Sequence, residues 1–303
     1  MTLESDLLLD RRRLKRQLGF WRGALVLGVV VLGGLWLGRG LPDALAGDHV
    51  ARLPIEGTIT DDPKLLREID RIRRDSHTRA VLVMIDSPGG TVAGGEGIYR
   101  ALRALRESGK PVVAVMRGTA ASAGYMVALP AERIFSREAT LTGSIGVLLQ
   151  SVEVSELVSR LGVRMETLTS GPLKDQPSPF RPLSEEGRTS LAGVVDDMYR
   201  QFVAMVVANR QMPEERVLSL ADGRVMTGRQ AVAAGLVDEI GGENEARNWL
   251  AANRGVAAEL PARDIDFRSL SERALSMASS SFWRGGVAAF RAEGWWPGTI
   301  LPR

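Results

Sequence analysis

Short apolar runs alternate with amphipathic segments along most of the chain. Val50–Ile55, Ala80–Ile85 and Pro111–Met116 are apolar runs of the length of a strand. Residues 64–74 and 95–107 lie between them and repeat apolar side chains at helical spacing. Because near-continuous apolar strands are typical of a sheet covered on both faces, the pattern predicts an α/β fold.

The second half of the chain continues this alternation less regularly. We expect a helix that begins near Ser122, strands or turns at Arg133–Ser136 and Thr140–Val147, a short helix at Val154–Leu161 and a strand at Val163–Leu168. Residues 169–183 contain four prolines and are interpreted as an ordered loop. A long helix is predicted from Ser184 to about residue 210, because two glutamates occupy its first turn.

The N-terminal part of the chain has the pattern of a membrane anchor. Residues 23–38 are 16 residues without a charge, and Phe20 and Trp21 lengthen the apolar run toward the thickness of a bilayer. A basic cluster at residues 11–16 precedes it, so the positive-inside rule places the N-terminus in the cytoplasm. A cleaved secretory signal, with Ala44-Leu45-Ala46 as its site, and a buried soluble helix are the alternatives.

These patterns divide the chain into five parts. We predict a basic cytoplasmic N-terminus over residues 1–19, a single-pass transmembrane anchor over 20–38, a linker over 39–49, the main domain over 50–263 and a tail over 264–303. The main domain would then be extracytoplasmic. The tail holds three of the six tryptophans, and either packs or is disordered, or contacts the membrane surface or a neighbouring subunit.

The composition excludes several kinds of catalytic and metal site. The absence of cysteine excludes disulfides, thiol catalysis and cysteine-ligated metals, and two histidines leave little room for a histidine-rich metal site. The net charge is +3, but residues 1–40 hold seven basic and three acidic side chains, which leaves 32 basic and 33 acidic residues in the remainder. This balance argues against nucleic acid as a partner of the folded domain.

Three polar segments follow the predicted strands. Gly89 lies in a Ser-Pro-Gly-Gly turn, where backbone N–H groups could form an oxyanion hole, although the segment is also compatible with a plain turn. Ser122 lies at a strand-to-helix turn among small residues, where it could be a nucleophile or only an N-cap. Ser144 and Lys174 lie in two further glycine-containing segments, and a lone loop lysine is usually solvated.

The combination favours a serine hydrolase that uses lysine as its base. Neither His49, in the predicted linker, nor His77, in a polar turn, is well placed to assist Ser122. A lysine can replace histidine when its environment lowers the amine pKa from about 10.4 to roughly 7–8. A second hydroxyl, such as that of Ser144, could orient the neutral amine.

Several segments, taken in this order and spacing, resemble the signal peptide peptidase A family in its short bacterial form. They are SPGG, AASAGY, LTGSIGV, SGPLKD with SPFRPLSEEGR, and VMTGRQAVAAGLVDEIGG, within residues 50–250. The resemblance implies a crotonase-like (Clp-protease-like) fold and a Ser–Lys dyad. By motif, Ser122 is the nucleophile, Lys174 the base, Ser144 the residue that positions the lysine, and Gly89 an oxyanion-hole N–H. Ala123 stands where the family often has glycine.

The resemblance further implies a ring-shaped homo-oligomer, an octamer in short forms, in which a site is completed by Ser122 of one chain and Lys174 of the next. We expect an endopeptidase that degrades residual signal peptides and other apolar membrane-associated peptides, without metal or nucleotide. The resemblance places it at the bacterial inner (cytoplasmic) membrane, with its catalytic domain periplasmic or otherwise extracytoplasmic. A related membrane quality-control peptidase with the same dyad is the near alternative. A crotonase-type acyl-CoA enzyme and a non-catalytic scaffold of the same fold are the distant ones.

Overall fold

The computed structural model describes residues 19, 21–23, 25, 26, 28, 29 and 47–265. Contacts divide the chain into two units, residues 1–49 and 50–303, of which the second contains the folded domain. Most of the predicted anchor and nearly all of the predicted tail lie outside the described residues. Among the helices that are described, none combines the length and the apolar character needed to cross a bilayer.

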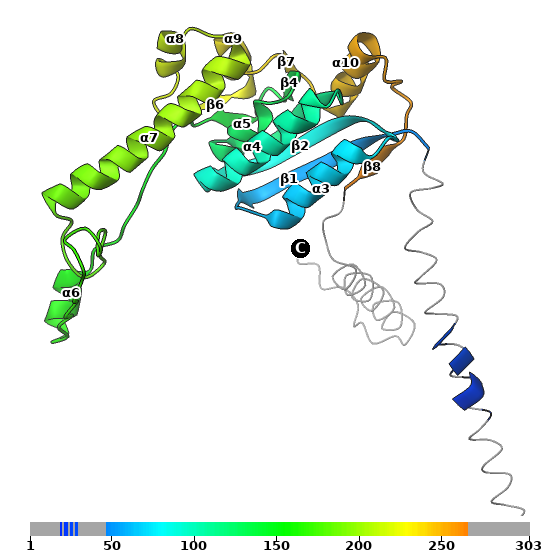
Figure 1. The fold of residues 1–303 in the computed structure, drawn as a ribbon. Coiled ribbons are helices and arrows are strands. Elements are labelled where there is room, and N and C mark those ends of the chain that lie inside the picture. The colour runs from blue at the N-terminus through cyan, green and yellow to red at the C-terminus, as the bar shows by residue number, and fades with distance from the viewer. Residues whose placement is uncertain (1–18, 20, 24, 27, 30–46, 266–303) are drawn as a thin grey trace, which may run out of the picture. The chain divides into compact units, whose positions relative to one another are not determined.

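A single sheet forms the centre of the domain (Figure 1). Its strands are β1 (His49–Ile59), β2 (Thr78–Gly90), β3 (Val112–Ala121), β4 (Arg133–Ser136), β5 (Leu141–Gly143), β6 (Val225–Thr227), β7 (Glu239–Ile240) and β8 (Ala262–Asp264). The order is β6-β5-β3-β2-β1-β8, with β4 paired to β3 and β7. Pairing is parallel between β2 and β3 and between β3 and both β4 and β5, whereas β5 and β6 are antiparallel.

Helices cover both faces of this sheet, which confirms the predicted α/β fold. The helices of the domain are α3 (Pro63–Arg74), α4 (Val92–Glu107), α5 (Ala123–Ala128), α6 (Ser155–Arg160), α7 (Glu185–Arg210), α8 (Glu214–Leu218), α9 (Gly228–Ala234) and α10 (Glu243–Arg254), of which α6 lies apart from the sheet. Alternate residues of β2 face opposite sides: Val81 and Val83 pack with α3, α4 and α5, while Leu82 packs with α10. This two-sided burial explains the continuous apolar runs in the sequence.

The predicted long helix is present as α7. Its N-cap is Ser184, whose side chain accepts a hydrogen bond from the Gly187 N–H at 3.0 Å. The other main helices also begin where polar caps occur in the sequence, with Asp62 at α3 and Thr91 at α4. Strand β1 begins at His49, which is 5% exposed, so this histidine belongs to the sheet and not to a linker.

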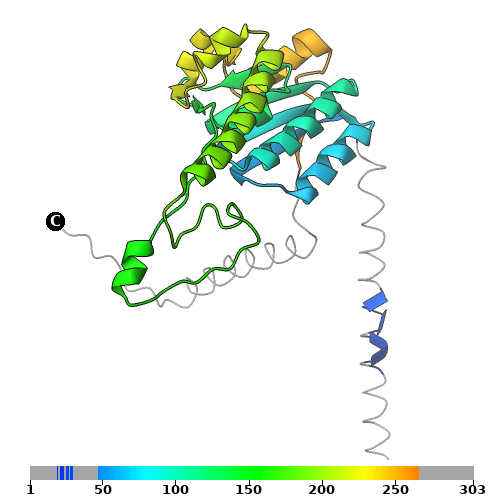
Figure 2. The ribbon, with the colours of Figure 1, turned by 60° about the vertical axis from the view of Figure 1, so that its left-hand side comes forward.

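A long excursion, residues 147–183, leaves the sheet and returns at the start of α7; we call it the arm (Figures 1 and 2). It contains α6 and otherwise irregular chain, and the Val154 N–H donates to the Pro179 carbonyl at 2.7 Å, which joins its two limbs. The strand predicted at 163–168 is wrong, because these residues have no regular structure. Leu168 is 93% exposed, so its apolar run has no sheet to join in this chain.

Candidate active site

Ser122 occupies the junction between β3 and α5. Its φ of 53° and ψ of −120° are rare for a residue with a side chain and cost about 1–3 kcal/mol of backbone strain. The N–H of Ser122 donates to the Gly143 carbonyl at 3.0 Å, and the Met126 N–H donates to the Ser122 carbonyl at 3.0 Å. The side chain makes no capping bond, so the hydroxyl is displayed at the turn as in a nucleophile elbow.

Ser144 is brought beside this junction by the register of the sheet. Strands β3 and β5 are parallel, and Ala121 pairs with Gly143, so Ser122 and Ser144 each follow the last residue of a paired strand. Ser144 also has positive φ, 50°, and its N–H donates to the Arg224 carbonyl at 2.8 Å. The two serines predicted from separate motifs therefore lie at the same edge of the sheet.

Gly89 packs directly against Ser122. Its φ is +118°, and a Cβ at this position would lie 2.9 Å from the Ser122 Cβ and 3.1 Å from the Ala121 carbonyl oxygen. Both the conformation and the contact therefore require glycine. The Gly89 N–H donates to the Ser87 Oγ at 3.1 Å, and that hydroxyl donates to the Gly57 carbonyl at 2.6 Å.

Ala123 packs against a glycine of the neighbouring helix α4. It is 3% exposed, and a Cβ added to Gly95 of α4 would lie 3.0 Å from the Ala123 Cβ. The absence of a side chain at Gly95 thus provides the room that the Ala123 methyl group occupies. This chain therefore has alanine at 123, where the resembled family often has glycine, and a glycine at position 95 of the neighbouring helix.

Ser122 and Ser144 open into one cavity of about 980 Å³. Its walls are largely apolar and come from the start of α4, from residues 146–149 and from one face of α7. On α7 the lining residues include Leu191, Val195 and Tyr199, which are four residues apart and so share one face. The cavity can hold several apolar side chains next to the hydroxyl of Ser122.

The ionisable side chains that line this cavity are poor candidates for a base. Arg224 holds the pKa of Asp222 at about 2 through hydrogen bonds to its carboxylate, so Asp222 is a weak base. Asp196 accepts a hydrogen bond from Arg200 at 2.8 Å. Arg188 and Tyr199 are the other such residues lining the cavity, and no His or Lys of the described chain lines it.

Lys174 lies elsewhere, on the arm. Its side chain is exposed, its N–H donates to the Gly171 carbonyl at 3.2 Å, and it is not among the described residues that line the cavity with Ser122. The structure therefore brings Ser122, Ser144 and Gly89 together within one chain and places Lys174 on a separate segment.

Two contributions to the site were absent from the sequence-based interpretation. The face of α7 that lines the cavity could have been found, because Leu191, Val195 and Tyr199 form a visible stripe at helical spacing. The Ser87 hydroxyl, buried between Gly57 and Gly89, could not, because its partners depend on how β1 and β2 lie together.

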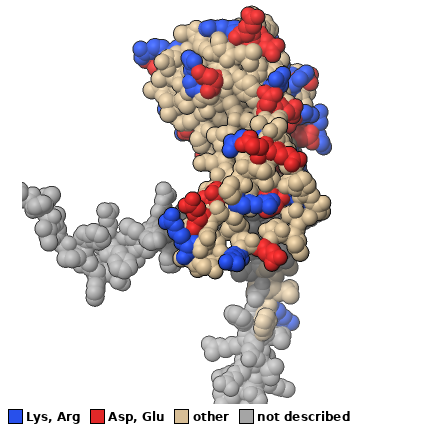
Figure 3. All heavy atoms as spheres, turned by 90° about the vertical axis from the view of Figure 1, so that its left-hand side faces the viewer, with Lys and Arg blue, Asp and Glu red and all other residues tan. Residues whose placement is uncertain are grey.

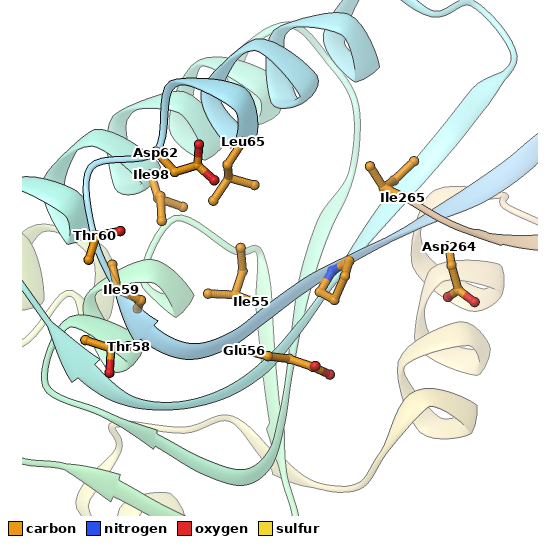
Figure 4. A pocket seen from close by; sticks show the side chains of 11 residues that line it. Ile55, Glu56, Thr58, Ile59, Thr60, Asp62, Leu65, Ile98, Asp264 and Ile265 are labelled. Carbon is orange, nitrogen blue, oxygen red and sulfur yellow. The ribbon is translucent and has the colours of Figure 1, made fainter. Parts of the chain in front are cut away.

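A second cavity, of about 550 Å³, lies beside β1 and α3 (Figure 4). Isoleucine and leucine side chains gather there with threonines, and its acidic residues are engaged elsewhere. Glu56 pairs with Arg117 at 2.9 Å, Asp62 caps α3, and Asp264 pairs with Arg52 at 2.9 Å. The described residues that line it include no serine, and none of them has a strained backbone like that of Ser122.

Charges on the face that bears the arm are mixed (Figure 3). Acidic and basic side chains adjoin there without a large area of one sign. Short-range ion pairs of the described domain include Arg200 with Asp196 on α7, at 2.8 Å, and Arg224 with Asp222 before β6. Among the described residues on this face, basic side chains do not gather into a continuous stripe.

Comparison with known families gives two matches. The model of Peptidase family S49 matches residues 104–257, which include Ser122, Ser144 and Lys174. The model of Clp protease matches residues 61–146, which include Gly89 and Ser122. The second match agrees with the expected Clp-protease-like domain.

Curated relatives are also named as proteases. The chain is 39% identical over 209 residues to a putative protease of Synechocystis, which covers 68% of this chain and 75% of the relative. It is 33% identical over 223 residues to a putative signal peptide peptidase SppA of Enterococcus faecium, covering 69% and 65%. It is 34% identical over 226 residues to Protease 4 of Salmonella typhi, covering 75% of this chain but 36% of that longer protein.

Proposed function

Since this chain belongs to peptidase family S49 and is a serine protease, we propose that it is a membrane-anchored endopeptidase with a Ser122–Lys174 dyad, acting on apolar peptides such as residual signal peptides. The observation that carries the proposal is the strained Ser122 elbow, which opens into a large apolar cavity beside Gly89.

In the proposed reaction, the Ser122 Oγ attacks the carbonyl carbon of the scissile peptide bond. The Lys174 amine takes the proton of the Ser122 hydroxyl and transfers it to the amine that leaves. The remaining acyl-enzyme is then hydrolysed by water. The developing oxyanion accepts a hydrogen bond from the Gly89 N–H, which exchanges the Ser87 Oγ for the oxyanion as its acceptor. Ser144 holds the lysine amine toward Ser122.

The proposal includes a homo-oligomer in which a second copy supplies Lys174. Two features support this. The cavity with Ser122 lacks a lysine from its own described chain, and the arm that carries Lys174 exposes apolar side chains that a neighbouring copy would bury. Exposed examples are Leu148 at 81%, Leu161 at 72% and Leu168 at 93%. An octameric ring, as in short-form relatives, would repeat this contact around a closed axis.

The substrate class follows from the lining of the cavity and from the N-terminus. Apolar walls favour apolar side chains around the scissile bond, and the uncharged run at residues 23–38 would hold the domain next to a membrane, at its extracytoplasmic face. Residual signal peptides combine an apolar sequence with that location.

The test is cleavage of a fluorogenic peptide with an apolar residue before the scissile bond, by the full chain in detergent. Ser122→Ala and Lys174→Ala are expected to fall to background. Ser219→Ala and Lys64→Ala, which alter exposed side chains that do not line the cavity, serve as matched controls and should retain activity. Full activity of Lys174→Ala would refute the assignment of the base, and full activity of Ser122→Ala would refute the nucleophile.

A further inference from the structure

The residues directly after Lys174 are the best-packed part of the arm. Lys174 is exposed, but Asp175, Gln176 and Pro177 are half-buried and Ser178 is 6% exposed. Contacts of these less exposed residues fix the backbone of the segment, and with it the position of Lys174. The position of the Lys174 amine therefore depends on what Asp175 and Gln176 touch.

Asp175 is held by Arg181, which closes the loop. The Arg181 guanidinium lies 3.1 Å from the Asp175 carboxylate and also donates to the Asp175 backbone carbonyl at 3.2 Å. Arg181 thus forms an ion pair with the side chain, and a hydrogen bond with the main chain, of the residue next to Lys174. The Asp175 side chain is 26% exposed and that of Arg181 44%, so the pair is partly shielded from water.

Gln176 rests on the first turn of α7, where Gly187 leaves room for it. A Cβ on Gly187 would lie 2.7 Å from Gln176 Oε1, 2.9 Å from its Cδ and 3.0 Å from its Cγ. Gly187 is buried, and it does not have positive φ, so its backbone does not itself require glycine. The missing side chain at Gly187 is needed for the contact with Gln176.

We propose that Arg181 and the contact between Gln176 and Gly187 position Lys174 for catalysis, by fixing its loop to the start of α7. These are positioning residues, since they act through Lys174 and not on the substrate. The inference rests on the proposed function, in which Lys174 is the base. Helix α7 is 26 residues long and packs on the core through Phe202, Val203 and Val206, so it gives the loop a rigid support.

The first experiment substitutes Gly187→Ala in the full chain. Alanine is favoured over glycine within a helix, so the thermal midpoint should not fall, but its methyl group must displace Gln176. Because a misplacement of about 1 Å at a catalytic group can cost on the order of 10²-fold in rate, kcat should fall by about that factor while KM changes little. Gly193→Ala is the matched control on the same helix, since its Cβ would meet no atom within 4 Å.

A double variant separates the contact from a general effect of Gly187→Ala. Gln176→Ala removes the three atoms that the new methyl group would strike and also removes the anchor. The double variant should therefore be no slower than Gln176→Ala alone, a non-additive result typical of residues in contact. Simple multiplication of the two losses in kcat would contradict the proposed contact.

Arg181 provides an independent test that leaves α7 unchanged. Arg181→Met should lower kcat, and Arg181→Lys should recover part of the loss, because it restores the charge opposite Asp175. Arg160→Met, which removes an ion pair of the same arm with side chains 80% and 86% exposed, is the control and should keep the wild-type kcat.

The outcomes distinguish this inference from the proposed function. Lys174→Ala is measured in the same series, and its full activity would remove the base and the proposed function with it. If Lys174→Ala is inactive while Gly187→Ala and Arg181→Met match their controls in kcat, the dyad stands and the positioning role is overturned. If Gly187→Ala misfolds, the Arg181→Met and Arg181→Lys pair decides.

Discussion

Replacement of Ser87 by alanine would test whether its hydroxyl holds the turn beside the nucleophile. Ser87 is fully buried, and its Oγ donates to the Gly57 carbonyl at 2.6 Å and accepts from the Gly89 N–H at 3.1 Å. Ser87→Ala leaves both groups without this partner. Gly57 is exposed and water can replace the hydroxyl there, whereas the bond to the Gly89 N–H is buried.

The expected loss is a net hydrogen bond of about 1 kcal/mol at Gly57 and an unsatisfied donor worth about 1–3 kcal/mol at Gly89, or about 2–4 kcal/mol together. For a domain of this size, each kcal/mol corresponds to roughly 2–4 °C in thermal midpoint, so Tm should fall by roughly 4–16 °C. Differential scanning calorimetry and denaturant titration would measure both quantities.

The matched control is Ser219→Ala, whose hydroxyl donates to the Arg216 carbonyl at the exposed end of α8. It should change the unfolding free energy by no more than about 0.5 kcal/mol. A Ser87→Ala variant as stable as this control would refute the reasoning, because it would show that neither of the two hydrogen bonds of Ser87 contributes to the stability of the fold.

Two further predictions concern the contribution of Arg210 and Lys110 to the unfolding free energy of the domain. Arg210→Met should lower the unfolding free energy by about 3 kcal/mol, because it removes the ion pair at 2.7 Å and leaves half-buried Asp238 with the Ile134 N–H as its hydrogen-bond donor. Arg200→Met, in an exposed pair, should cost at most about 1 kcal/mol, and equal losses in denaturant titration would contradict the argument. Burial lowers the pKa of Lys110, so the folded state binds the proton of this amine less tightly than the unfolded state does. The unfolding free energy of wild type relative to Lys110→Met should therefore rise as the pH increases toward about 10.4, the ordinary pKa of lysine. A difference that does not change with pH would contradict this.

The central fold could be predicted because its signals are local. The apolar runs at β1, β2 and β3 and the caps Asp62 and Ser184 each act on their own neighbourhood, and the strands and helices appear where those signals are. The prediction of a strand at Val163–Leu168 was wrong because it also used only local signals. Its composition favours a strand, but a strand also needs a partner, and the arm lies away from the sheet.

The sequence indicates candidate residues for the site but does not show how they come together. The motifs around Ser122 and Ser144 were visible in the sequence, yet their proximity depends on the pairing of Ala121 with Gly143, which links residues 22 positions apart. The contact between Gly187 and Gln176 could not be predicted either, since it depends on the position of the arm relative to α7.

The most direct test of the account is complementation between two inactive chains. Ser122→Ala and Lys174→Ala chains, carrying different tags, would be co-expressed, purified as mixed oligomers through both tags and assayed for peptide cleavage. If Ser122 of one copy is served by Lys174 of the next, random mixing regenerates about a quarter of the sites in a head-to-tail ring, and activity should return to about that level. Mixed oligomers as inactive as either variant alone would contradict a site completed between neighbouring copies.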